Sequence, residues 1–171
     1  MRLFQKSLEL IRIKALMIKA NVITDNFNWL NYIKNPNNYI DRKIKKLNSR
    51  NDIFFKKKLF FTLLLSDSAK IKKLNKKFRK KNKITDVLSF PFQQKKEFKK
   101  KLKDEKEIYL GDIIVNLNKV KKKGLTQDFK LEFDRLWLHG LIHLFGHDHK
   151  KNKDFQLMKK IEDEYFNLIN G

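Results

Sequence analysis

The sequence predicts a single small α+β domain in which a mixed sheet of about four strands packs against helices. The chain has 171 residues, which suits one domain with one hydrophobic core. Short apolar segments with the period of strands are interspersed with longer segments of helical period, and no internal repeat is present. The segment 129–145 is apolar on nearly every side, so we expect this helix to be buried against the sheet.

The N-terminal half is predicted to supply two strands and two helices. Residues 1–16 form an extension, and Met17 is an alternative start for a domain that covers 17–171. The helix after the second strand is placed by the N-cap residues Ser66 and Asp67, with Leu74 and Phe78 on its inner side. We expect, in order, a strand at 17–24, a helix at 29–48 interrupted near Pro36, a strand at 59–65 buried on both sides, a helix from 67 to about 77, and a basic loop at 79–83.

The C-terminal half is predicted to supply two more strands and three helices. A lysine-rich segment at 93–107 has little apolar content, so we expect an exposed and mobile connection there. The expected elements are a strand at 87–90 closed by Pro91, a strand at 109–115, a helix at 117–123 broken at Gly124, the apolar helix at 129–145, and an amphipathic helix at 152–169.

All four histidines of the chain fall between residues 139 and 149. His139 and His143 are four residues apart, so on a helix they project from one face about one turn from each other. Gly146 can end the helix in a left-handed turn, which lets His149 approach the same point. Three imidazole ligands on one metal ion leave a fourth coordination position open, as in a catalytic zinc site. The pattern therefore predicts one Zn²⁺ per chain, bound by His139, His143 and His149, whereas His147 is a weaker candidate.

The same window matches the zinc-protease pattern H-E-x-x-H-x-x-G-x-x-H except at Gly140, where those proteases carry their general base. Glycine has no side chain that could transfer a proton, so peptide hydrolysis is disfavoured. A neighbouring backbone or a substrate that passes close would explain a glycine at this place in a helix. Asp148 adjoins the site and could orient a histidine as an outer partner or cap the turn.

Charge and composition limit the classes of partner and cofactor that the protein can bind. Lys and Arg number 41 against 19 Asp and Glu, for a formal net charge of +22, which attracts polyanions such as RNA. The absence of cysteine excludes disulfides and Cys-ligated zinc. No apolar stretch approaches the roughly 20 residues that span a bilayer, and the N-terminus does not read as a secretory signal, so we expect a cytoplasmic protein with no membrane partner.

Three segments in order resemble the YbeY family of bacterial endoribonucleases and rRNA maturation factors. They are Leu74-Asn75…Phe78-Arg79…Thr85-Asp86-Val87-Leu88-Ser89-Phe90-Pro91, then Leu110-Gly111-Asp112-Ile113, and then the histidine window with its closing Gly-x-Asp-His. The resemblance covers residues 17 to 169. Two departures from the family pattern are His147, where the family usually carries tyrosine, and the N-terminal extension.

The resemblance implies a metal-dependent ribonuclease specific for single strands, which acts in 16S rRNA 3′-end maturation and in 70S ribosome quality control. It implies RNA precursors, the small ribosomal subunit and assembly factors as partners, and no organic cofactor. It carries over His139, His143 and His149 as ligands, with Arg79 in the active-site channel. We take Arg79 and His139 as catalytic, and Arg79, Lys80, Lys81 and Lys83 as contacts to the RNA backbone. The general base stays open among Asp148, Asp86 and Asp112. The alternative reading is a metal-stabilised RNA-binding assembly factor with little catalysis of its own.

Overall fold

The computed structural model describes residues 16–49, 57–124, 128–147 and 152–171. Its elements are β1 (Leu16–Thr24), the 3₁₀ helix η1 (Phe27–Asn31), α2 (Pro36–Asn48), β2 (Lys57–Ser66), α3 (Ser68–Arg79), β3 (Val87–Pro91), α4 (Lys95–Asp104), β4 (Glu107–Asn116), α5 (Leu117–Gly124), α6 (Phe129–Leu144) and α7 (Asn152–Asn170). The predicted single α+β domain with a four-stranded mixed sheet is confirmed. The division at residue 17 stays a prediction, because residues 1–15 lie outside the described residues.

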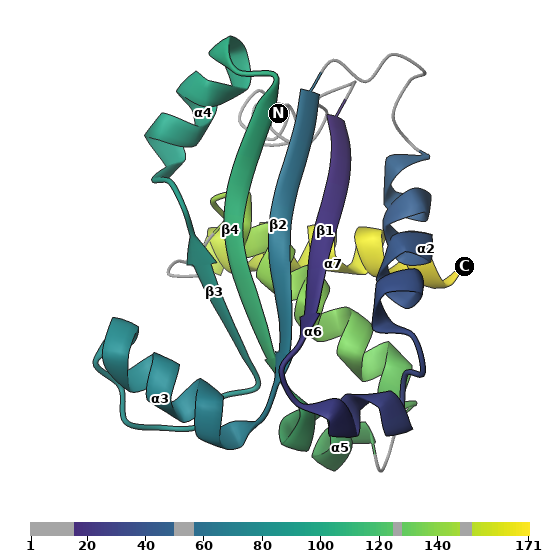
Figure 1. Cartoon of the computed structure of the whole chain (residues 1–171). Coiled ribbons are helices and arrows are strands. Elements are labelled where there is room, and N and C mark those ends of the chain that lie inside the picture. The colour runs from purple at the N-terminus through teal and green to yellow at the C-terminus, as the bar shows by residue number, and fades with distance from the viewer. Residues whose placement is uncertain (1–15, 50–56, 125–127, 148–151) are drawn as a thin grey trace.

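The strands lie in the order β1-β2-β4-β3 (Figure 1). β1, β2 and β4 run parallel to one another, and β3 runs antiparallel to β4. β3 is therefore an edge strand with one open side. Parallel strands need crossover connections, and α2 and α3 belong to the segments that make them here.

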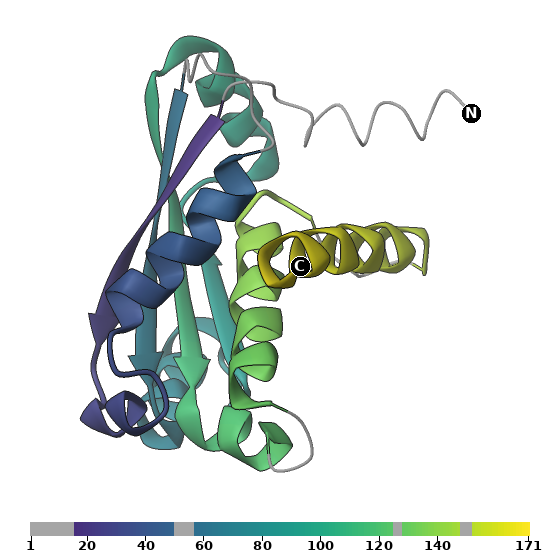
Figure 2. The same cartoon turned by 90° about the vertical axis from the view of Figure 1, so that its right-hand side faces the viewer.

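The two faces of the sheet are covered differently. On one face α2 and α6 form a second layer against the strands, and α7 packs across these two helices, as Figure 2 shows with the sheet seen from its edge. The main core lies between these layers, and its fully buried side chains include Phe61, Phe133 and Trp137. On the opposite face α3 covers only part of the sheet, over a small cluster of Ile71, Leu88 and Ile114.

Two expectations about burial were wrong. β2 is not buried on both sides: Phe61 and Leu63 are fully buried toward α6, while Phe60 and Leu64 are only half-buried on the other face. Phe78 is 57% exposed rather than on the inner side of α3. The lysine-rich segment is mostly exposed, as expected, but its residues 95–104 form a helix, α4, anchored by the buried Phe98. Neither composition nor helical period tells which face of an element a neighbour covers.

No helix among the described residues is both long enough and apolar enough to cross a membrane.

Candidate metal centre and active site

Helix α6 carries the histidine pair and is fixed at both ends. Asp128 caps its first turn by accepting hydrogen bonds from the backbone N–H groups of Lys130 and Leu131. At the other end Gly146 has φ +83°, a left-handed conformation that favours glycine, and its N–H donates to the carbonyl of His143. The predicted helix, and the turn at Gly146 that ends it, are both confirmed.

His139 and His143 face each other across one turn of α6. Their Nε2 atoms lie 3.0 Å apart. The Nδ1 of His143 donates to the backbone carbonyl of His147 at 2.8 Å, and the Nδ1 of His139 forms a short hydrogen bond with a carboxylate oxygen of Glu162 on α7. Because both Nδ1 atoms face acceptors, neutral imidazoles in this arrangement carry their hydrogen on Nδ1 and direct both Nε2 lone pairs to one point.

This arrangement fits a metal ion. Two lone pairs 3.0 Å apart repel each other unless a proton or a cation lies between them. Ligand nitrogens of a tetrahedral zinc site lie about 3.3 Å apart, since each Zn–N bond is about 2.0 Å long. The carboxylate on the far nitrogen of His139 is the usual outer partner of a metal-ligating histidine. The chemistry of the donor set therefore agrees with the predicted zinc.

The third predicted ligand, His149, and the predicted outer partner, Asp148, lie outside the described residues, so both stay predictions. Within the described part of the chain no group of three or more His, Cys, Asp or Glu side chains is placed to hold a metal. His147 serves the site through its backbone carbonyl, which orients His143. Burial, and then the charge of Lys95, lower the pKa of the His147 ring.

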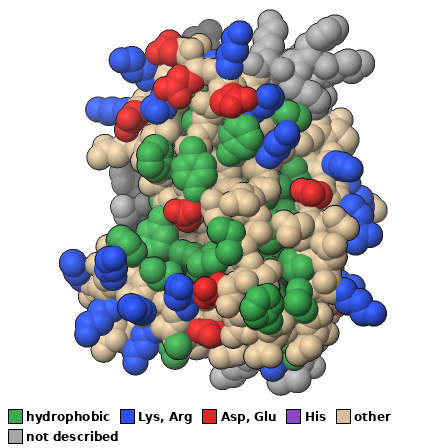
Figure 3. All heavy atoms as spheres, in the orientation of Figure 1, with side chains coloured by type: hydrophobic (Ala, Val, Ile, Leu, Met, Phe, Trp, Pro, Cys, Tyr) green, Lys and Arg blue, Asp and Glu red, His purple; other side chains and the backbone are tan. Residues whose placement is uncertain are grey.

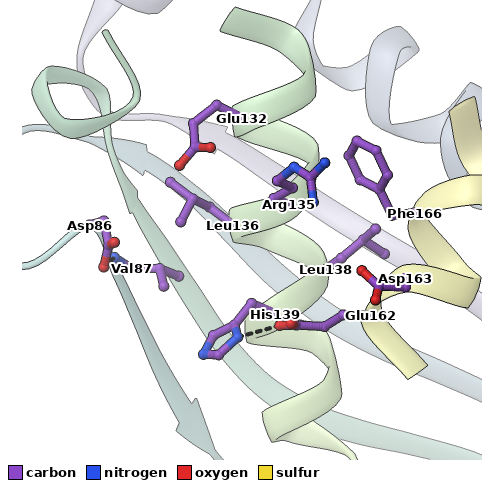
Figure 4. A pocket seen from close by; sticks show the side chains of 10 residues that line it. All are labelled: Asp86, Val87, Glu132, Arg135, Leu136, Leu138, His139, Glu162, Asp163 and Phe166. Carbon is purple, nitrogen blue, oxygen red and sulfur yellow. Dashed lines mark hydrogen bonds and ion pairs between the residues drawn. The ribbon is translucent and has the colours of Figure 1, made fainter. Parts of the chain in front are cut away.

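A cavity of about 310 Å³ opens beside His139 between α6, α7 and the start of β3. Figure 4 shows the nitrogen of His139 that bonds to Glu162 on one side of the ring, with the other ring nitrogen directed away from α7. The charged side chains that line the cavity are the carboxylates of Asp86, Glu132, Glu162 and Asp163 and the guanidinium of Arg135. This excess of carboxylates makes the cavity a poor place for the phosphates of a polyanion.

Asp86 and Asp112, two of the candidate general bases, lie on different faces of the sheet. Asp86 lines the cavity beside His139 and is held by hydrogen bonds from its neighbours, the hydroxyl of Thr85 and the N–H of Val87. Asp112 accepts a hydrogen bond from the hydroxyl of Tyr109 and points to the opposite face from Ile113, which packs against α6. Of these two, only Asp86 shares a face with the histidine pair.

Gly140 is explained by close packing of α6 on β4. A Cβ atom at this position would lie 2.7 Å from Cγ2 of Ile113. A side chain of the neighbouring strand, rather than its backbone or a substrate, therefore occupies the space that a larger residue would need. The place where zinc proteases carry their glutamate faces the core here, which further disfavours peptide hydrolysis.

Arg79 ends α3 and reaches the open side of β3. Its Nη2 donates to the backbone carbonyl of Ser89 at 3.0 Å, and its guanidinium lies 5.7 Å from the ring centre of Phe90. β3 in turn packs against α6. Lys80, with φ 58°, forms the left-handed end of α3, and Lys80, Lys81 and Lys83 are all exposed. The side chain of Arg79 thus bonds to β3, the strand that packs against the histidine helix. Its contact with RNA stays a prediction.

Glu162 is the site residue that sequence reasoning missed. It lies 23 positions from His139, on a different helix, and neither its spacing nor its surroundings distinguish it from the other acidic residues of α7. Only the packing of α7 across α6 reveals its role.

Comparison with known proteins identifies the family. The family model described as endoribonuclease YbeY matches residues 25–170. The chain belongs to the endoribonuclease YbeY family. It is 42% identical over 156 residues to endoribonuclease YbeY of Pelagibacter ubique (strain HTCC1062), a match that covers 90% of this chain and 97% of the relative. It is 31% identical over 146 residues to endoribonuclease YbeY of Fusobacterium nucleatum, with 84% and 88% covered.

A solved structure supports the fold. The solution structure of TM1509 from Thermotoga maritima superposes with a TM-score of 0.58 at 21% identity and covers 88% of this chain and 89% of that chain. The family model and the two relatives, rather than this structure, confirm membership of the YbeY family and the predicted enzyme class.

Proposed function

We propose that this chain is a zinc-dependent endoribonuclease that cleaves single-stranded RNA, with RNA precursors of the small ribosomal subunit as substrate. Within this proposal it acts in the cytoplasm in 16S rRNA 3′-end maturation and ribosome quality control, together with the small subunit and assembly factors. The observation that carries the catalytic part is the convergence of two imidazole nitrogens 3.0 Å apart, each held in orientation from its far side. Membership of the YbeY family supports RNA as the substrate.

His139, His143 and His149 would hold the zinc. When bound to three imidazoles with one open position, zinc lowers the pKa of a water molecule to about 7 and polarises phosphoryl oxygens. The protein's own part is to hold the imidazoles. The hydrogen bond to Glu162 keeps the proton of His139 on Nδ1 and makes its Nε2 a stronger donor of its lone pair, while the carbonyl of His147 does the same for His143.

Arg79 is the residue proposed to bind the phosphate. Among the described residues its hydrogen-bond partner is the carbonyl of Ser89, which uses one of its five N–H donors and fixes the side chain to β3. The remaining donors can bind two phosphate oxygens in a fork and offset the negative charge that grows during cleavage. Asp86 lies beside His139 and is the carboxylate we assign to proton transfer.

The test is cleavage of a single-stranded RNA that carries the 3′ precursor junction of the small-subunit rRNA. Wild type, Arg79→Ala and His139→Ala are compared, and the zinc content of each sample is measured. We expect cleavage by the wild type alone, zinc retained in Arg79→Ala, and zinc lost or weakened in His139→Ala. Equal cleavage by all three proteins would point to a contaminating nuclease and would favour an assembly factor that binds RNA without cutting it.

A further inference from the structure

Phe78 stands out because a large aromatic side chain is left in water. It lies at the end of α3 and is 57% exposed. Its ring packs edge-on against Phe90 of β3, with ring centres 5.3 Å apart, and the ammonium of Lys77 lies 5.1 Å from its centre. Its outer surface is thus held in a fixed orientation and is not covered by the part of the protein that the structure describes.

The aromatic surface continues along β3. Phe90 lies on β3, and Phe92 follows directly after the end of this strand, where its N–H still donates to the carbonyl of Leu110 on β4. Their side chains therefore project to the same face of the sheet. Phe92 is 66% exposed and packs edge-on against Tyr109 of β4 at 5.6 Å. The hydroxyl of Tyr109 is fixed between Thr62 at 2.8 Å and Asp112 at 2.6 Å. We call these four residues, Phe78, Phe90, Phe92 and Tyr109, the aromatic row.

The half-buried members of the row are held by their neighbours. The hydroxyl of Tyr109 has two hydrogen-bond partners, and burial together with the Asp112 carboxylate raises the pKa of Tyr109, which keeps its hydroxyl neutral. Arg79 lies over the ring of Phe90 while it bonds to Ser89, so one basic side chain joins the row to the open side of β3. The two exposed rings, Phe78 and Phe92, therefore each pack against a half-buried ring, Phe90 and Tyr109 respectively.

The charge beside the α3 end of the row is strongly positive, whereas the carboxylate of Asp112 lies at the Tyr109 end. Residues 70–83 contain nine Lys and Arg and no acidic residue, so the closest acidic residues in the sequence are Asp67 and Asp86. Figure 3 shows hydrophobic side chains gathered on the face of the sheet turned away from α6, with Lys and Arg clustered over α3. The cavity on the α6 side of the sheet has the opposite character, with four carboxylates and one arginine. Basic side chains therefore flank the α3 end of the row, whereas most of the charged side chains that line the cavity are carboxylates.

We propose that the aromatic row is a stacking path for the bases of single-stranded RNA, from which the strand crosses the open side of β3 to the histidine pair. Exposed aromatic rings bind bases of any sequence through their faces, while neighbouring cations bind the phosphates. A duplex cannot use such a path because its bases are already stacked on one another. The path thus accounts for single-strand specificity, and it rests on the proposed ribonuclease function.

The experiment measures binding by fluorescence anisotropy with two labelled probes, a single-stranded RNA of about 12 nucleotides and an abasic strand of the same length. Phe78→Ala and Phe92→Ala should each weaken binding of the RNA roughly tenfold, within the range that loss of one stacked base produces. Binding of the abasic strand should not change. Phe155→Ala is the matched control, because Phe155 is 54% exposed but lies on α7.

A restoring variant separates stacking from folding. Phe78→Trp keeps an aromatic face and should bind RNA like the wild type. Equal weakening of both probes in Phe78→Ala would show a change of fold or charge and would overturn the path. Unchanged RNA binding in both alanine variants would also overturn it, and would make the row a surface for another partner, such as a protein.

The same samples distinguish this inference from the proposed function. If wild type cleaves the junction RNA and His139→Ala does not, but the Phe78 and Phe92 variants bind like wild type, the row is wrong and the ribonuclease stands. If wild type neither binds nor cleaves single-stranded RNA, both proposals fall. Loss of binding confined to the base-bearing probe, in an otherwise active enzyme, supports both.

Discussion

The two faces of the sheet offer the same kind of side chain very different surroundings. Two successive residues of β2, Phe60 and Phe61, are both phenylalanine, yet Phe61 is fully buried under α6 and Phe60 is half-buried on the opposite face. The face covered by α6, which we call the closed face, lies against the helix that carries the histidine pair. The opposite face, which we call the open face, carries exposed rings and basic side chains. The fold thus separates a region that must hold atoms in place from a region that can receive a long ligand.

The largest expected effect on stability is at Asp134, deep in the closed face. Its carboxylate is fully buried and is bound by Lys43 at 2.8 Å, by the indole of Trp137 at 3.0 Å and by the hydroxyl of Tyr39 at 3.1 Å. Burial raises the pKa of Asp134, and these three partners oppose that shift. Asp134→Ala removes the acceptor of the Trp137 indole and the Tyr39 hydroxyl and the counter-charge of Lys43, which keeps its hydrogen bonds to Ile169 and Asn170. We expect the free energy of unfolding in urea to fall by about 3–5 kcal/mol.

The matched control is an ion pair of similar length on the surface. Lys58 and Glu107 lie 2.9 Å apart, but their side chains are 45% and 59% exposed. Because water screens this pair, Glu107→Ala should lower the unfolding free energy by less than about 1 kcal/mol. Similar losses in the two variants would mean that Asp134 is not held as the structure shows.

A second effect, of intermediate size, is expected at Gly140. Alanine is the better helix former by about 1 kcal/mol, but a Cβ here meets Ile113 at 2.7 Å, and overpacking a core costs about 1–3 kcal/mol. The difference predicts that Gly140→Ala lowers the unfolding free energy by up to about 2 kcal/mol. In the background of Ile113→Ala the same change should become stabilising. A stabilised single variant would show that α6 does not lie this close to β4.

The closed face was also the part that sequence predicted well. Four strands and the histidine helix follow from local periodicity, and the histidine spacing alone placed two imidazoles on one face. Glu162 could not be predicted, because its contact with His139 depends on how α7 crosses α6. The different positions of Asp86 and Asp112 likewise could not be predicted, because Asp86 is placed by the cavity beside His139 and Asp112 by its contact with Tyr109 on the opposite face of the sheet.

A smaller effect is expected where α3 begins on the open face. The carboxylate of Asp67 accepts hydrogen bonds from the N–H groups of Ala69 and Lys70 at 2.9 and 3.0 Å. Asp67→Ala should lower the unfolding free energy by about 1 kcal/mol at neutral pH.

The contribution of Asp67 should also depend on pH. The backbone hydrogen bond from Lys70, followed by the side-chain hydrogen bond from Asn26, lowers the pKa of Asp67 below 3.8. Its contribution is therefore fully present above pH 3.8 and is lost as pH falls through the lower pKa of the folded state. Asp67→Asn keeps the cap without the charge, so its stability should lack this acid-dependent loss. Urea unfolding at several pH values decides the matter, and an Asp67→Ala deficit that grows in acid would contradict the prediction.

The smallest expected effect on stability is at Phe78. Since its ring is 57% exposed, Phe78→Ala should change the unfolding free energy by less than about 1 kcal/mol. The fully buried Phe61 is the comparison, and Phe61→Ala should cost about 3–5 kcal/mol. Thermal or urea unfolding measures both variants. A loss at Phe78 as large as the loss at Phe61 would mean that the open face is covered by something, such as a second copy of the chain.

Sequence failed most on this open face. Helical period assigns Phe78 to the side of α3 that also carries Leu74, but α3 ends at Arg79 and its last turn projects beyond what the sheet can cover. Composition also failed to predict α4, because only one residue of this helix, Phe98, is buried and most of the others are lysines. The local sequence pattern shows which side chains of a helix would be buried against a neighbouring sheet. It does not show where the edge of that sheet lies.

The close seating of Gly140 on Ile113 has a consequence for how the enzyme loses activity on heating. Local opening of a protein begins where few buried contacts hold a segment. The histidine pair lies on a helix that cannot lift without uncovering Trp137 and Phe133, so the pair should open only with the whole domain. Hydrogen exchange at the amides of His139 and His143 should then be as slow as global unfolding allows, while the end of α3 exchanges far sooner. If both proposals hold, heating should weaken RNA binding at the aromatic row before it displaces the histidine pair.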